Sequence, residues 1–119
     1  MSAKPFDTSV LDAALERERL ALERERRQVV DRVLHLLDRW GPVYGIRSAY
    51  LFGSVARPGR FRQNSDVDLA VEQIDSQSFF RAWGHLSAEL GRSLDLVELA
   101  HCPFAAKIRR EGIEWTQST

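Results

Sequence analysis

Two acidic residues, Asp66 and Asp68, stand one residue apart at the start of an apolar run and are candidates for metal chemistry. Side chains alternate between the faces of a strand, so residues i and i+2 point the same way. The two carboxylates therefore share a face and repel each other unless a cation lies between them. Because carboxylate oxygens are ligands that suit Mg²⁺, the pair predicts a magnesium site.

A second feature lies upstream, where Gly53 and Ser54 close another apolar run. A glycine lets a phosphate approach main-chain N–H groups, and the serine adds a hydroxyl and a further N–H. The loop that follows carries Arg57, Arg60 and Arg62, which place fixed positive charge where a triphosphate would lie. Each feature alone is common on protein surfaces. Their order along strand, loop and strand is what predicts a nucleotide site.

Apolar periodicity predicts the elements that must position these residues. In chain order we expect a helix over 9–40, a strand over 47–52, a strand from 66 to 71, a helix between Ser76 and Gly91, a strand over 93–99, a helix from Pro103 to Glu111 and a short strand over 113–115. This alternation predicts an α/β fold in which helices pack on one side of a small mixed sheet. The other face of the sheet is then free for the site.

The expected helix over 9–40 is long for so short a chain. Its thirty-two residues would span about 48 Å, so the first half, residues 9–28, should extend beyond the core as an interaction surface. The motif Glu-Arg-Glu-Arg occurs twice there, seven residues apart, beside a stripe of apolar residues with the same spacing. One such stripe is half of a coiled-coil seam. The pattern leaves open a partner protein, a second copy of the chain, or a helix that is simply solvated.

Length and composition limit the classes of protein that fit. The 119 residues suit a single domain over 1–119, and a net charge of zero argues against direct nucleic-acid binding. Cys102 is the sole cysteine, which excludes an intramolecular disulfide and favours a reducing compartment. The sequence shows neither a secretory signal nor an apolar run long enough for a membrane span. We therefore expect a soluble, cytoplasmic protein.

The order Gly53-Ser54, loop, Asp66-x-Asp68 resembles the signature of the DNA polymerase beta superfamily of nucleotidyltransferases. The form Gly-Ser-x-Ala-Arg is similar to its minimal nucleotidyltransferase branch, and the resemblance covers residues 29–115. One departure is that eleven residues separate Ser54 from Asp66, where family members commonly have ten, and Pro58 marks the extra one. The departure concerns the path of the loop and leaves the carboxylates unaffected.

The resemblance also implies a chemistry and a set of residues for it. In this family a third carboxylate comes from a neighbouring strand, and Asp95 occupies that place here. The implied reaction transfers AMP from ATP to an acceptor hydroxyl with the help of Mg²⁺, two ions in the full arrangement. The resemblance implies catalytic and metal-binding roles for Asp66, Asp68 and Asp95, and nucleotide binding by Gly53, Ser54 and Arg57.

Small stand-alone members of this branch are similar to antitoxins of toxin–antitoxin systems. They act beside a helical HEPN toxin, a ribonuclease that some of them silence by attaching AMP to a tyrosine. The resemblance therefore implies protein AMPylation and a toxin partner. Two alternatives remain: a small-molecule enzyme resembling aminoglycoside nucleotidyltransferases, and a non-catalytic nucleotide-binding module that masks its partner sterically. The former usually carries an extra helical domain, which this chain lacks.

Overall fold

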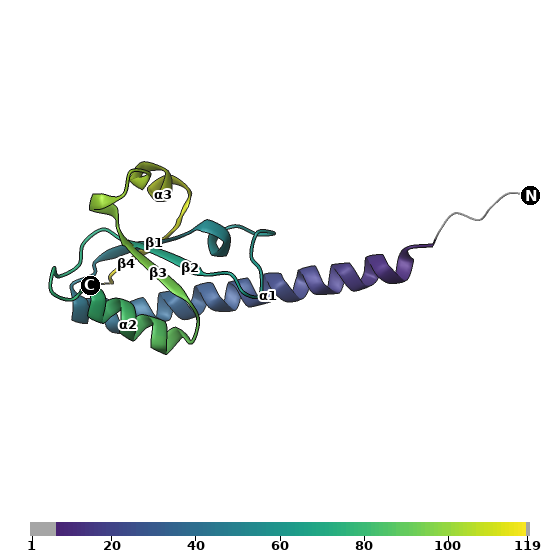
Figure 1. Ribbon diagram of the computed structural model, residues 1–119, viewed down its shortest axis with the longest axis horizontal. Helices are drawn as coiled ribbons and strands as arrows, with labels where there is room; N and C mark the ends of the chain where they lie inside the picture. The colour runs from purple at the N-terminus through teal and green to yellow at the C-terminus, as the bar shows by residue number, and fades with distance from the viewer. Residues whose placement is uncertain (1–6, 119) are drawn as a thin grey trace, which may run out of the picture.

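The computed structural model describes residues 7–118, which form an α/β fold with a long N-terminal helix (Figure 1). The helices are α1 (Ser9–Trp40), α2 (Phe79–Leu90) and α3 (Ala105–Glu111), and the strands are β1 (Ser48–Phe52), β2 (Val67–Val71), β3 (Leu94–Glu98) and β4 (Ile113–Thr116). Short 3-10 turns, η1 (Pro42–Tyr44), η2 (Gly53–Ala56) and η3 (Leu99–His101), connect them. No helix in this part of the chain combines the length and apolar character needed to cross a membrane.

The four strands form one mixed sheet in the order β3-β2-β1-β4. Strand β1 pairs antiparallel with both β2 and β4, whereas β2 and β3 are parallel. A parallel pair needs a crossover between its strands, and α2 supplies it. The predicted fold class, a small mixed sheet with a long N-terminal helix, is confirmed.

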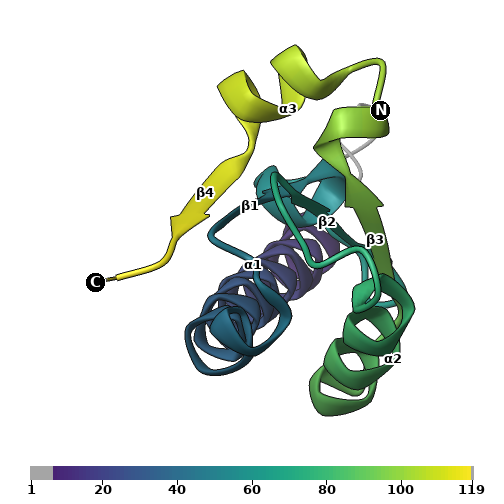
Figure 2. The ribbon, with the colours of Figure 1, turned by 90° about the vertical axis from the view of Figure 1, so that its left-hand side faces the viewer.

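Helices α1 and α2 cover one face of the sheet, and the short helix α3 lies on the opposite side (Figure 2). The covered face holds the main core, in which Leu51 and Leu69 of the sheet pack with Leu37 of α1. On the other face Ile108 of α3 packs with a small cluster around Tyr50. The two long helices therefore occupy the expected side, while α3 covers only part of the second face. The uncovered part of that face is called the open face below.

The predicted boundaries agree with the structure to within a few residues. Helix α2 begins at Phe79, later than expected, because Ser78 N–H donates to the carbonyl of Asp75 at 2.8 Å and closes a turn first. Helix α3 begins at Ala105, two residues after Pro103. Such differences at element ends follow from local turns that apolar periodicity does not encode.

The two halves of α1 differ sharply in their surroundings. Residues 9–21 are exposed without exception, and Figure 1 shows this stretch projecting from the body. The second half lies under the sheet and buries Val29, Val33 and Leu37. We call residues 9–21 the arm. The fold thus has a compact α/β body and a helical extension that makes little contact with it.

Candidate active site

The site lies on the open face, where strand alternation puts two carboxylates in one row. Asp68 of β2 pairs in register with Asp95 of β3 on one side and with Phe52 of β1 on the other. Residues paired in register point to the same face, so these three side chains stand side by side. The next residues, Leu69 and Leu96, point into the core beneath α1 and α2. The alternation that builds the core therefore also lines up the acids.

The other two predicted acids affect the ionisation of Asp68. Asp66 is exposed one residue before β2, Asp68 is half-buried, and Asp95 is exposed on β3. Burial raises the pKa of Asp68 above its usual value, and the negative charges of Asp95 and then Asp66 raise it further. The ionised row is therefore unfavourable by itself, and a bound cation would relieve the repulsion.

Gly53 and Ser54, which we call the phosphate cradle, begin a turn whose first residue lies against this row. The φ of Gly53, +73°, lies in the left-handed region that favours glycine, and a Cβ at this position would collide with Oδ2 of Asp68. Ser54 follows in η2, and the first amide groups of such a turn have no carbonyl partner within it. Free amides next to a carboxylate are suited to holding a phosphate that carries a metal ion.

The donor set fits magnesium brought in with a nucleotide. Within residues 7–118, no three His, Cys, Asp or Glu side chains form a preassembled group that could hold a metal ion. Mg²⁺ does not need such a cage, because it is usually bound by one or two carboxylates together with substrate phosphates and water. The in-register pair Asp68 and Asp95 provides that number, with Asp66 beside it. The residues therefore fit a nucleotide-borne ion better than an independent metal centre.

Arg57 forms an ion pair with a residue of α3. Its Nη2 is 2.9 Å from Oε2 of Glu111 in α3, and both side chains are about half exposed. The pair borders a pocket of about 340 Å³ that Gly53, Phe104 and Lys107 also line. The structure thus brings together Asp66, Asp68, Asp95, Gly53 and Ser54, whereas Arg57 is held by α3. Nucleotide binding by Arg57 stays a prediction.

Sequence reasoning missed Arg92, which holds the end of the loop just before the first carboxylate. Its guanidinium donates to the carbonyls of Ser65, at 3.3 Å, and Gln63. It also pairs with Glu25 of α1 at 3.2 Å and lies 4.7 Å from the ring centroid of Phe61. The only signal in the sequence is an arginine directly after the glycine that ends α2. Nothing in that signal indicates which loop the side chain would reach.

Comparison with known proteins gives the family. The model of the family described as "Polymerase beta, Nucleotidyltransferase" matches residues 43–116, more than half of the chain. The chain therefore belongs to the polymerase beta nucleotidyltransferase family. The matched segment contains every predicted site residue. A search of curated proteins finds no match.

Solved structures with the same fold include antitoxin complexes. One, described as a toxin–antitoxin with AMP-PNP, is 23% identical with a TM-score of 0.56, over 75% of this chain and 73% of that one. Another, the toxin–antitoxin MntA-HepT, is 22% identical with a TM-score of 0.52, over 77% and 73%. A further solved structure, described only by its source, Shewanella oneidensis, is 19% identical with a TM-score of 0.51, over 72% of this chain and 71% of that one. At these identities the likeness shows the fold.

Proposed function

We propose that this protein transfers AMP from ATP to a hydroxyl group of a partner protein, as the antitoxin of a toxin–antitoxin pair. The observation that carries the proposal is the row of Asp68 and Asp95 with the glycine turn of Gly53 packed against it. Carboxylates beside free amides suit a nucleoside triphosphate and its metal ion better than they suit an uncharged ligand. The antitoxin complexes among the structures of the same fold, one of them with AMP-PNP, support the choice of nucleotide and partner.

In the proposed reaction the acceptor oxygen forms a bond to the α-phosphorus of ATP. The bond from that phosphorus to the bridging oxygen of the β-phosphate breaks, and pyrophosphate leaves. Asp95, at the edge of the row, accepts the proton of the acceptor hydroxyl and passes it to solvent. The amides of Gly53 and Ser54 hold the phosphates in place. Asp66, Asp68 and Asp95 would hold Mg²⁺, which supplies charge neutralisation at the reacting phosphate.

The arm of α1 is our candidate for the partner surface. Its apolar residues Val10, Leu11 and Leu15 are more than half exposed, which is unfavourable for a helix without a partner. A groove of about 670 Å³ runs between α1 and the loop, lined by Leu15, Leu22 and Phe61 among others. This loop joins the two parts of the nucleotide motif. A partner seated in the groove would therefore contact the loop between Ser54 and Asp66.

The test is transfer of label from α-³²P-ATP to a protein co-purified with this chain, in Mg²⁺ and in EDTA. We expect Mg²⁺-dependent label on the partner, and intact-mass analysis should show one added AMP for each modified hydroxyl. The matched control is label in the γ-position, which should stay with pyrophosphate. Label on this chain alone, or on no protein, would contradict the proposal.

Asp68→Asn separates transfer from simple masking. If catalysis silences the partner, the variant should still bind it but no longer neutralise it. Neutralisation that survives in Asp68→Asn and in Asp66→Asn would instead show that the chain acts by covering its partner. Size-exclusion chromatography with light scattering on the same samples shows whether the arm binds the partner or a second copy of this chain.

A further inference from the structure

Arg26 is the only charged side chain within residues 7–118 that is buried, at 8% exposure. It lies where α1 leaves the body, and its neighbour Arg27 is exposed. Every other residue that α1 buries is apolar. Burying a guanidinium is unfavourable unless hydrogen bonds compensate for the lost water. The hydrogen bonds of Arg26 should therefore compensate for this cost, and they show which parts of the protein the side chain connects.

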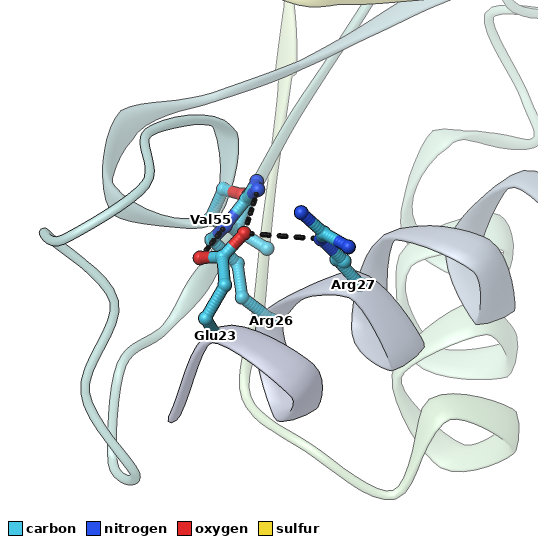
Figure 3. A network of polar contacts seen from close by, with 4 residues as sticks. All are labelled: Glu23, Arg26, Arg27 and Val55. Atoms are coloured by element: carbon cyan, nitrogen blue, oxygen red, sulfur yellow. Dashed lines mark hydrogen bonds and ion pairs between the residues drawn. The ribbon is translucent and has the colours of Figure 1, made fainter. Parts of the chain in front are cut away.

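The guanidinium of Arg26 joins α1 to the nucleotide motif (Figure 3). Its Nε and Nη2 donate to the two carboxylate oxygens of Glu23, at 2.9 Å and 2.7 Å. Its Nη1 donates to the carbonyl of Val55 at 3.1 Å, across 29 positions of sequence. The paired carboxylate raises the pKa of Arg26, and this bond in turn lowers the pKa of Glu23 to about 2. Both groups stay ionised at neutral pH.

Val55 is in the middle of η2, the turn that begins with Gly53 and Ser54. Its side chain is fully buried in the core, and its carbonyl is held by Arg26. The turn is thus fixed from two sides, while its first residue lies against Asp68. Holding a binding loop in its bound conformation beforehand raises affinity, so a fixed turn matters for phosphate binding.

We propose that Arg26 is a positioning residue that fixes the η2 turn for the phosphates of the nucleotide. The kinetic part of this inference rests on the proposed function, whereas the effect on the turn itself does not. Glu23 belongs to the same unit, because its bidentate bond orients the guanidinium toward the turn. Helix α1 and the η2 turn are thereby joined by one side chain. If Arg26 had only a structural role, its substitution would lower the stability of the whole fold and would not loosen the η2 turn in particular.

The matched pair of variants is Arg26→Met and Arg27→Met. Methionine keeps most of the apolar stem of arginine but removes the donors. Arg27 pairs with the same Glu23, at 3.2 Å, yet its side chain is 74% exposed and no hydrogen bond links it to η2. Both substitutions remove one positive charge from the same turn of α1. They differ in burial, in the bidentate bond to Glu23 and in the contact to Val55, and only the last of these reaches η2.

The first readout is hydrogen–deuterium exchange of the amides at residues 53–57, which requires no nucleotide. We expect Arg26→Met to increase exchange there about tenfold relative to Arg27→Met, the size expected for one lost charged hydrogen bond. Exchange in α2 should match in the two variants. Equal exchange at 53–57 in both variants would overturn the proposal, as would an increase spread evenly over the whole body.

The second readout is the KM for ATP against kcat. Arg26→Met should raise KM about tenfold while kcat stays within about threefold, because the reacting carboxylates are untouched. Arg26→Lys should recover part of the loss, since an ammonium group can donate to Val55 but cannot bind Glu23 in bidentate fashion. A selective fall in kcat would overturn the positioning role. If the wild-type protein binds no ATP, the proposed function fails and exchange at 53–57 alone decides the role of Arg26.

Discussion

The two faces of the sheet are built from the same strands but differ in their contribution to the stability of the fold. On the face beneath α1 and α2, Leu51, Leu69 and Leu96 pack into a continuous apolar core. On the open face the row contains Asp68 and Asp95, whose charges repel each other. Moving one residue along β2 therefore passes from a side chain that stabilises the fold to one that costs stability. This difference supports the proposal that the open face is kept for ligand chemistry.

The largest expected effect contrasts adjacent residues of β2 on opposite faces. Asp68→Asn should reduce AMP transfer by about 10²–10³-fold, the loss typical of removing a main electrostatic group from a reacting site. Leu69→Ala should instead lower the free energy of unfolding by about 2–5 kcal/mol, because it opens a cavity in the core. Transfer assays and urea denaturation of both variants test this. An unfolded Asp68→Asn, or one with full activity, would remove the distinction between the faces.

A second test concerns the glycine that lets the cradle approach the row. Gly53→Ala should reduce AMP transfer about tenfold or more, because the new methyl group displaces the carboxylate of Asp68. Gly91→Ala is the matched control, since Gly91 has a similar φ of +68° but no atom within 4 Å of an added Cβ. Both variants should lose about 1 kcal/mol of stability from backbone strain. Equal transfer rates in the two variants would argue against the close approach.

The pH dependence of stability gives a third, smaller effect. The folded pKa of Asp68 is raised, so the folded state binds this proton more tightly than the unfolded chain does. Stability from this group is therefore present at acidic pH and is lost as pH rises from the ordinary value of 3.8 through the raised one. Asp68→Asn should melt at a higher temperature than the wild type at pH 7. Thermal melts at pH 7 and pH 3.5 should show that this advantage vanishes in acid, and a constant difference would contradict the shift.

The smallest effect is expected at the edge of the open face. Glu111→Gln releases Arg57 from an exposed ion pair of the kind usually worth less than about 1 kcal/mol. If Arg57 binds the nucleotide once it is free, the KM for ATP should fall by a factor of about two to five. The matched control is Glu114→Gln, which removes another exposed carboxylate near the C-terminus. A KM that rises in Glu111→Gln would show that the ion pair itself supports binding.

Regular spacing of apolar residues in the sequence predicted the helices and strands. Alternation along 66–71 predicted a strand, found as β2 (Val67–Val71), with Asp68 and Leu69 on opposite faces. Helical spacing gave the length of α1 correctly. The side-chain contacts that hold the site have no regular spacing along the sequence. Arg26 reaches Val55 across 29 positions, and Arg92 reaches Glu25 across 67. Such contacts depend on the path of the whole chain, so a local pattern does not predict them.

The position of α3 on the sheet is likewise not predicted by a local pattern. Pro103 and Gly112 predicted the helix between them. The face of the sheet that the helix covers depends on the contact of Ile108 with Tyr50 and Ala70. The placement of Arg57 follows from it, since the partner of that arginine is Glu111 of α3. One element placed by tertiary packing thus gave Arg57 an ion-pair partner that the motif alone does not indicate, and its binding to the phosphates stays a prediction.

The most direct test of the central claim is calorimetric titration with an ATP analogue whose α–β bridge cannot be cleaved. The account predicts that the wild-type protein binds it in Mg²⁺ and binds it at least about tenfold more weakly in EDTA. Asp68→Asn and Asp95→Asn should lose the difference between the two conditions. Binding by the wild type that is equally tight with and without Mg²⁺, and unchanged in both variants, would contradict a nucleotide site on the open face.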